Sequence, residues 1–262
     1  KAMIYDAELY HKVTSGAYGV QAQGGFEFDF QRMMARKEEV VERLVSGVEK
    51  LLEANDVDIL RGTGSIPRPG QVCVEMDDGT KTLGTHAIIV ATGARPVQLP
   101  IPGLDLPGVI PSEGLMDLEA LPERMVIIGG GFIGCEYASL FHALGTEVTL
   151  LEKFTILMET DQQLARRMRS SFSRRGISVN EGVDVEKVER TEGGLRVTYQ
   201  DDETEAVEAD LVLLAVGRRP YVEGLGLEAL GVEMNGAAVA IDGAMRTNVP
   251  GIYAIGDCAG GP

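Results

Sequence analysis

Residues 126–153 read VIIGGGFIGCEYASLFHALGTEVTLLEK, and the fold class is predicted chiefly from this segment. An apolar run leads into Gly129-Gly130-Gly131-Phe132-Ile133-Gly134, which fits the spacing G-x-G-x-x-G. A helical pattern and a second apolar run, which Glu152 closes, come next. A glycine loop between a buried strand and a helix, with an acid about 20 residues further on, is the fingerprint of dinucleotide binding.

Each position of this loop has a chemical reason. Gly129 permits a tight turn, Gly131 lets the backbone approach a pyrophosphate because it has no Cβ atom, and Gly134 lets helix and strand pack closely. The start of the helix offers free N–H groups to the phosphates. Glu152 can accept hydrogen bonds from the adenosine ribose and would repel a 2′-phosphate, so the sequence favours NAD over NADP. The alternative interpretation is a glycine turn that only packs the corner between strand and helix.

The composition is that of an ordinary globular protein with an acidic surface. The 262 residues include 24 Lys and Arg against 40 Asp and Glu, a formal net charge of −16, which disfavours nucleic acid as a partner. No apolar run reaches the roughly 18 residues of a membrane span, and no signal-peptide pattern is present, so we expect a cytoplasmic protein without membrane contact. Cys73, Cys135 and Cys258 form no CxxC pair and indicate neither a disulfide framework nor a metal site.

The remaining periodicity predicts alternating helices and short strands, which is typical of a parallel sheet with helices on its faces. Asp29 is the expected N-cap of a long helix whose charged face is expected in solvent. The apolar face of that helix carries Met33, Val40, Val41, Leu44, Val48, Leu51 and Leu52. Predicted helices cover 1–18, 29–55, 133–144 and 161–175, with loops over 19–28 and 96–111. Predicted strands cover 57–62, 71–76, 80–91, 125–129, 147–152, 177–180, 184–190, 195–200, 205–216 and 251–256, those over 184–216 forming a three-strand meander.

One segment occurs twice. AIIVATGARP at 87–96 matches LVLLAVGRRP at 211–220, and each copy follows short strands and a turn. The second copy opens with the glycine loop, whereas no such loop precedes the first. The simplest interpretation is that the first copy has lost its opening strand and loop. Because the chain also begins with Lys1 in place of Met, we expect it to be a fragment.

Together with RTNVPGIYAIGDCAGGP at 246–262, these stretches resemble the FAD- and NAD-dependent disulfide oxidoreductases. The resemblance implies an α/β protein of tandem doubly wound domains, one binding FAD and one binding NAD(P). Each would have three layers, with a parallel sheet and a β-meander, and the FAD domain would be incomplete. It also implies domain boundaries: 1–112 as the first part of the FAD domain, 113–238 as the NAD domain and 239–262 as a return to the FAD domain.

The resemblance implies a set of cofactor contacts. Lys1 would lie near the flavin and form an ion pair with Glu136, Phe132 would gate the nicotinamide pocket, and Val183 would contact adenine. The alternative for Glu136 is a purely structural role, in which its charge interacts favourably with the positive end of the helix. The expected NAD contacts are Gly129, Gly130, Gly131, Phe132, Ile133, Gly134, Glu136, Glu152, Val183 and Gly217. The expected FAD contacts are Lys1, Gly64, Thr92, Gly93 and Asp257.

The redox cysteine pair and the His-Glu pair of that family have no counterpart in these 262 residues, so no catalytic residue is expected here. The resemblance implies a parent that oxidises dihydrolipoamide with NAD⁺ through FAD and a redox disulfide. Lipoyl groups of 2-oxo acid dehydrogenase complexes and a second subunit would be its partners. The chain alone is expected to be inactive, to bind NAD, and to hold FAD weakly or not at all. Alternatives are a parent of the mercuric reductase or NADH oxidase type, or an NAD-binding module without catalysis.

Overall fold

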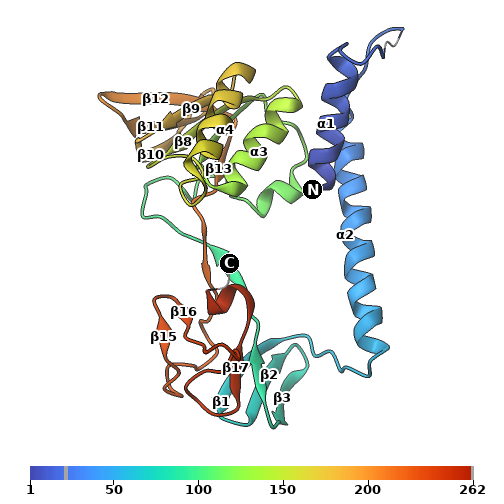
Figure 1. Ribbon diagram of the computed structural model, residues 1–262, viewed down its shortest axis with the longest axis vertical. Coiled ribbons are helices and arrows are strands. Elements are labelled where there is room, and N and C mark those ends of the chain that lie inside the picture. Colours follow the sequence, from blue (N-terminus) through green and yellow to red (C-terminus); the bar gives the residue numbers. More distant parts are fainter. Residues whose placement is uncertain (21–22, 261–262) are drawn as a thin grey trace. The chain divides into compact units, whose positions relative to one another are not determined.

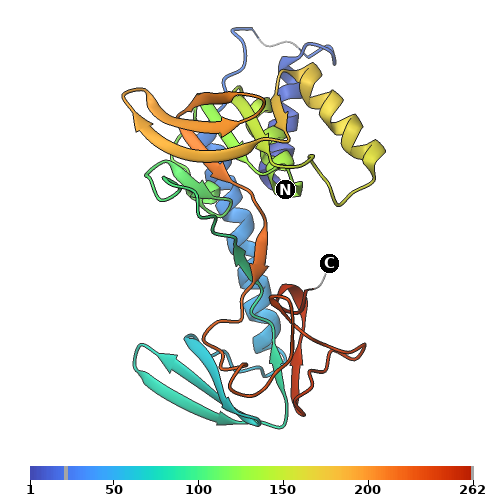
Figure 2. The ribbon, with the colours of Figure 1, turned by 90° about the vertical axis from the view of Figure 1, so that its left-hand side faces the viewer.

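The computed structural model describes residues 1–20 and 23–260, and it divides into two compact units. Unit 1 comprises Lys1–Ser46 and Gln98–Gly217, and unit 2 comprises Gly47–Val97 and Arg218–Pro262. Figures 1 and 2 show the elements of each. These two units are defined by contacts within the structure. The domain boundaries at 112/113 and 238/239 are implied by the resemblance and stay predictions.

A parallel sheet forms the middle layer of unit 1. Its strand order is β6-β13-β7-β8-β9. In β7, Met125 and Ile127 face one core cluster, and Val126 and Ile128 face another. A strand buried on both faces reads as a continuous apolar run, which is why this one is plain in the sequence. The strands are β6 (Val109–Pro111), β13 (Leu211–Leu214), β7 (Arg124–Ile128), β8 (Glu147–Glu152) and β9 (Ser178–Glu181).

Helices cover one face of this sheet. Phe141 of α3 and Phe172 of α4 are fully buried against it, and α1 packs beside α3 (Figure 1). The Asp161 side chain accepts N–H groups of the first turn of α4, and Gly176 ends that helix in the left-handed conformation. The helices are α1 (Ala2–Thr14), α2 (Phe30–Glu53), η1 (Gly114–Asp117), α3 (Phe132–Ala143) and α4 (Gln162–Arg175).

An antiparallel meander covers the other face of the sheet. It consists of β10 (Asp184–Thr191), β11 (Gly194–Gln200) and β12 (Thr204–Ala209), and its buried side chains pack on Val126, Ile128 and Val212. Helices, parallel sheet and meander therefore form the three layers that the α/β prediction requires, and that fold class is confirmed.

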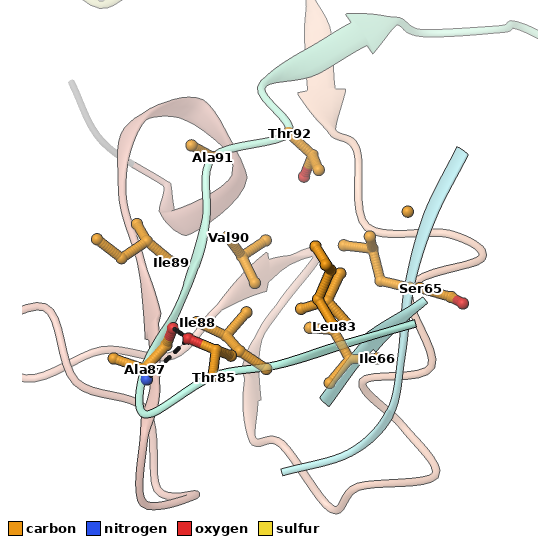
Figure 3. Close-up of a pocket in the computed structure, with 13 residues that line it drawn as sticks. Ser65, Ile66, Leu83, Thr85, Ala87, Ile88, Ile89, Val90, Ala91 and Thr92 are labelled. Carbon is orange, nitrogen blue, oxygen red and sulfur yellow. Dashed lines mark hydrogen bonds between the residues drawn. The ribbon is translucent and has the colours of Figure 1, made fainter. Parts of the chain in front are cut away.

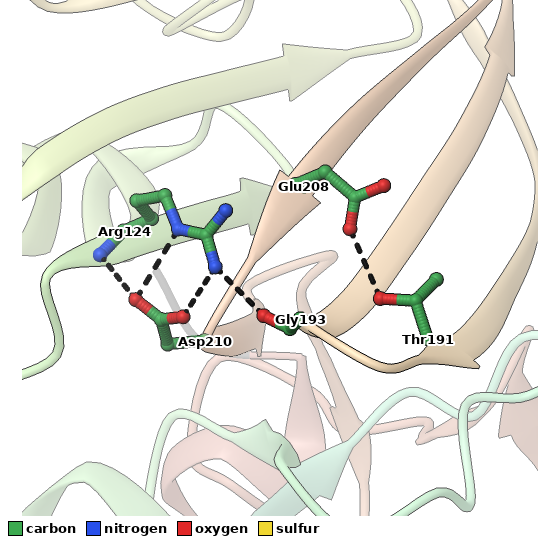
Figure 4. A network of polar contacts seen from close by, with 5 residues as sticks. All are labelled: Arg124, Thr191, Gly193, Glu208 and Asp210. Carbon is green, nitrogen blue, oxygen red and sulfur yellow. Dashed lines mark hydrogen bonds and ion pairs between the residues drawn. The ribbon is translucent and has the colours of Figure 1, made fainter.

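The predicted strand over 205–216 is wrong in one respect, because it is two strands. The chain leaves the meander after Ala209 and enters the parallel sheet at Leu211. Asp210 holds this corner: its carboxylate accepts the backbone N–H of Arg124 at 2.8 Å and the guanidinium Nη2 at 2.6 Å (Figure 4). Arg124 also donates to the Gly193 carbonyl in the turn between β10 and β11, so one side chain ties the meander to the sheet.

Unit 2 has its own core, built from a second meander and a two-stranded parallel sheet. The meander contains β1 (Thr63–Arg68), β2 (Gln71–Met76) and β3 (Gly79–Gly84), and the sheet pairs β4 (Ile88–Val90) with β17 (Ile252–Ala254).

The hairpin predicted at Asp78-Gly79 is confirmed. The predicted strand over 57–62 is wrong, since the strand begins at Thr63. The run over 80–91 is two strands, because the Thr85 hydroxyl bonds both backbone groups of Ala87 and turns the chain. Short elements complete the unit: β15 (Met234–Asn235), β16 (Ala238–Val239) and η2 (Gly256–Ala259).

The internal repeat is confirmed. In each copy a three-stranded meander leads into a parallel strand, β1–β3 into β4 and β10–β12 into β13. The matching ends of the two copies also pair with each other: β5 (Ala94–Pro96) lies antiparallel to β14 (Arg218–Pro220), with Arg95 opposite Arg219.

The long helix α2 begins as predicted but packs differently. The Asp29 side chain accepts the Arg32 N–H at 2.8 Å, which confirms the N-cap. Phe30, Met33 and Met34 are buried. Further along, the apolar face is not covered within the described residues, and Leu44 is 66% exposed. Val41, Val45, Val48 and Leu51 are exposed with it.

Candidate nucleotide-binding site

The glycine loop lies between β7 and α3, at the carboxyl edge of the parallel sheet. Gly129 has φ +107°, and a Cβ atom there would lie 2.4 Å from the Ala215 carbonyl oxygen. A Cβ atom at Gly134 would lie 2.0 Å from the Gly129 carbonyl oxygen. At Gly131 a Cβ atom would meet nothing within 4 Å. The first and last glycines are thus required by packing, whereas the middle one leaves open space beside the backbone.

The start of α3 is suited to an anion. Gly131 is its N-cap and makes no side-chain capping bond, so the N–H groups of the first turn keep their donors for a ligand. Phe132 is 62% exposed at this end, and Ile133 packs on the core below. A pyrophosphate fits a helix start that has free donors and no Cβ atom in the way.

Glu152 is held beside this loop. One carboxylate oxygen accepts the Gly130 N–H at 2.5 Å, and the other accepts the Phe154 N–H at 2.8 Å. The side chain is half-buried and points toward the glycine loop. A carboxylate oxygen has more than one lone pair, so both can still accept hydrogen bonds from a ribose.

A second carboxylate, not predicted from the sequence, lies next to the first. The parallel register of β8 and β9 sets Glu181 opposite Glu152. Glu181 accepts the N–H of the fully buried Ile156 at 2.7 Å and forms an ion pair with Arg169 of α4. The sequence signal that could have revealed it is an acid at the end of the next parallel strand, in the same position as Glu152.

Cys135 is the nearest thiol to the site. Its Sγ donates to the Gly130 carbonyl oxygen at 3.4 Å, and the side chain is buried. Burial first, then the charges of Glu152 and Glu181, raises the pKa of this thiol to about 12. The thiol therefore stays protonated at neutral pH and supports the loop as a hydrogen-bond donor.

The predicted ion pair between Lys1 and Glu136 is present. Lys1 immediately precedes α1, Glu136 lies in the first turns of α3, and both side chains are largely exposed. The proximity of this pair to a flavin remains a prediction.

The other two expected NAD contacts lie at the same edge of the sheet. The Val183 N–H donates to the Glu152 carbonyl oxygen at 3.1 Å, while its side chain is 1% exposed in the core under the meander. Gly217 is exposed, has φ +103°, and lies two residues after Ala215, which touches the glycine loop. Unit 1 therefore brings every expected NAD contact to one region of its fold.

The expected FAD contacts other than Lys1 lie in unit 2. Gly64 and Thr92 line a cavity of about 340 Å³ whose walls are mostly apolar, with Ile66, Val90 and Leu225 among them (Figure 3). The Thr92 hydroxyl donates to the Tyr221 carbonyl, and Gly93, at φ +72°, accepts the Tyr221 N–H at 2.9 Å. Asp257 is exposed in η2. A mostly apolar cavity fits part of a large aromatic cofactor.

The comparison with protein families decides the assignment. The model of the pyridine nucleotide-disulphide oxidoreductases matches residues 2–262. The chain belongs to this family. Dihydrolipoyl dehydrogenase of Bacillus subtilis is 32% identical over 265 residues, which cover all of the chain and 57% of that relative. Dihydrolipoyl dehydrogenase of Pseudomonas aeruginosa is 37% identical over 269 residues, with the same coverage.

Solved structures of the family agree. LpdA from Mycobacterium tuberculosis superposes with a TM-score of 0.88 at 28% identity, covering 99% of the chain and 57% of LpdA. The HOCl-induced flavoprotein disulfide reductase RclA from Escherichia coli superposes with a TM-score of 0.85 at 29% sequence identity, covering the whole chain and 56% of RclA. The chain thus spans little more than half the length of these relatives.

Two further features bear on the site. Within residues 1–20 and 23–260, no group of three or more His, Cys, Asp and Glu side chains could hold a metal ion. In the same part of the chain, no helix is both long and apolar enough to cross a membrane.

Proposed function

We propose that unit 1 binds NAD(H) and that the chain is the nucleotide-binding part of a flavin-dependent disulfide oxidoreductase. One observation carries the proposal: Gly129 and Gly134 are crowded by backbone, while Gly131 faces open space at an uncapped helix start. A glycine turn needed only for packing would not require a glycine at position 131. Glu152 beside the loop supplies the acceptor for a ribose.

Each residue has a binding role in this proposal. The N–H groups at the start of α3 orient the pyrophosphate, and Glu152 selects a ribose without a 2′-phosphate because two anions would repel. Phe132 covers the nicotinamide end, and the Lys1–Glu136 pair places a charge-compensated acid beside it. The bound nicotinamide supplies the hydride acceptor. The protein binds, orients and excludes water.

The activity of the whole protein is the wider part of the proposal. The relatives named dihydrolipoyl dehydrogenase favour a parent that oxidises dihydrolipoamide with NAD⁺. A cytoplasmic location, lipoyl groups as partners and a second subunit belong to the same proposal. Gly64, Thr92, Gly93 and Asp257 would hold FAD together with residues outside this sequence. We expect the 262 residues alone to hold FAD weakly and to turn over no dihydrolipoamide.

Fluorescence titration of the 262-residue chain with NADH tests the proposal. We expect saturable binding, weaker binding of NADPH, and a Kd raised about tenfold in Glu152→Ala, because one charge-assisted hydrogen bond is lost. Glu208→Ala is the matched control, since Glu208 is held by Arg196 and Thr191 in the meander and makes no contact with the loop. The absence of binding at millimolar NADH would contradict the proposal.

A second candidate is a flavoprotein disulfide reductase with another substrate. The similarity to RclA, at 29% identity across the whole chain, favours it. The full-length protein, assayed with dihydrolipoamide and NAD⁺ and separately with NADH and a disulfide as electron acceptor, separates the two. Turnover in the first assay supports the first candidate. Reduction of the disulfide by NADH, without turnover of dihydrolipoamide, supports the second.

A further inference from the structure

We propose that Glu181, with Arg169, is a positioning residue for the nucleotide site. It holds residues 153–157 against the glycine loop and so fixes the backbone that meets the pyrophosphate. This inference rests on the proposed function, because the ligand is the nucleotide of that same site. It adds two residues that the glycine fingerprint does not contain.

The contacts run from Glu181 to the loop without a break. Glu181 accepts the Ile156 N–H at 2.7 Å, and the Ile156 Cγ2 atom lies 2.7 Å from the position of a Cβ at Gly130. The next residue, Leu157, donates its N–H to the Gly130 carbonyl oxygen at 2.8 Å. Since Glu152 accepts the Gly130 N–H, residue 130 is held at both its N–H and its C=O. Segment 153–157 is one of three supports of Gly130, together with Glu152 and the Cys135 thiol.

The segment is also attached at its two ends: Lys153 forms an ion pair with Asp184, and the Leu157 carbonyl oxygen accepts the Thr160 N–H at 2.9 Å. Phe154 donates to Glu152 and accepts the Gly182 N–H at 3.0 Å, so its start is bound to the ends of β8 and β9. Between these ends, the Ile156 N–H donates to the Glu181 carboxylate. Loss of that acceptor would leave the N–H of a fully buried residue without a partner, which favours a shift of the segment.

Arg169 makes a carboxylate at position 181 tolerable. Glu152 and Glu181 are neighbours in the sheet, and a bound pyrophosphate would add negative charge near both. The Glu181 side chain is only 15% exposed, and its ion pair with Arg169 offsets this repulsion. The Arg169 Nε atom is buried and has no hydrogen-bond partner in the described part of the chain, so the side chain is held chiefly through Glu181.

Variants of the 262-residue chain, titrated with NADH, test the positioning role. We expect Glu181→Ala to raise the Kd about three- to tenfold, because a buried hydrogen bond to the segment is lost. Glu181→Gln keeps a carbonyl oxygen for the Ile156 N–H and should restore most of the affinity. Glu208→Ala, which also removes a carboxylate paired with arginine, should lower the melting temperature but leave the Kd unchanged. An unchanged Kd in Glu181→Ala, or no recovery in Glu181→Gln, would overturn the role.

Amide hydrogen exchange without nucleotide separates this inference from the proposed function. In Glu181→Ala, the amides of Ile156 and Leu157 should exchange faster, while those of β11 should not change. Unchanged protection at both amides overturns the inference whatever the affinity for NADH. If protection falls as expected but the unaltered chain binds no NADH, the segment is held as described and the proposed function is what fails.

Discussion

Gly131 and Gly134 lie three residues apart in one loop, yet a methyl group at each would meet different surroundings. At Gly134 it would collide with the carbonyl oxygen of Gly129, and at Gly131 it would meet nothing within 4 Å. The φ of Gly131 is −71°, which alanine also adopts. The two positions therefore separate folding from binding.

We expect Gly134→Ala to lower the free energy of unfolding by about 1–3 kcal/mol, because backbone must move to make room. Gly131→Ala should change it by less than about 0.5 kcal/mol and still raise the Kd for NADH about tenfold, because the new methyl group keeps the pyrophosphate from the backbone. Urea unfolding and NADH titration measure the two effects. Equal loss of stability in both variants would contradict this assignment.

Asp210 gives a pH-dependent contribution. Hydrogen bonds from Arg124 hold the pKa of this carboxyl below its ordinary value of 3.8. The folded chain therefore favours the ionised form, so the stabilisation is present above about pH 4 and is lost as the pH falls through the lowered pKa. Because Asp210 is partly exposed, the effect is modest.

We expect Asp210→Asn to be less stable than the unaltered chain at pH 7, with the difference shrinking below about pH 4. Thermal unfolding followed by circular dichroism from pH 3 to 7 checks this. Thr247→Val, in the other unit, is a control whose effect should not depend on pH. A difference that grows toward acid pH would show that the sign is wrong.

At the scale of elements, α2 shows a helix whose apolar face was predicted correctly, although the pattern did not show how much of that face is buried. Its apolar residues recur on one face, and its N-cap forms as predicted. Only the first turns of that face are buried, since Phe30, Met33 and Met34 reach the core of unit 1. Periodicity reveals that a face is apolar, but it cannot reveal how far along the helix a neighbour extends.

We expect Met33→Ala to lower the free energy of unfolding by about 2–5 kcal/mol, because it opens a cavity in the core. Leu44→Gln, on the exposed part of the same face, should change it by less than about 0.5 kcal/mol. Urea unfolding of the two variants of the 262-residue chain makes the comparison. A large loss in Leu44→Gln would mean that this face is covered in solution.

At the scale of the whole molecule, the two units have separate hydrophobic clusters. Those of unit 1 lie on the two faces of its parallel sheet, and that of unit 2 lies between its meander and the β4–β17 pair. Every expected NAD contact belongs to unit 1. A ligand that binds one folded unit stabilises that unit by mass action.

We expect calorimetry of the 262-residue chain to show that NADH raises the unfolding temperature of unit 1 and leaves that of unit 2 unchanged. At about 100 times the Kd, the added stability should be about 2.7 kcal/mol. The Glu152→Ala variant should show a smaller shift at the same concentration. A shift of the unit 2 transition alone would contradict the placement of the site.

The glycine loop, the cap at Asp29, the doubled segment and the Lys1–Glu136 pair were all predicted from the sequence. The first three follow from local spacing and backbone preference, which act within a few residues, and the pair followed from the resemblance. The split at Asp210 was missed because an arginine distant in the sequence makes that corner.

Three features were not predicted from the sequence and are set only by the tertiary structure: the position of Glu181 beside Glu152, the pairing of the two ends of the repeat, and the later turns of α2, which no described residue covers. The first two depend on the register between strands, and the third depends on how far the neighbouring elements extend along the helix. Such contacts join residues far apart in the chain, and no local pattern encodes their distance.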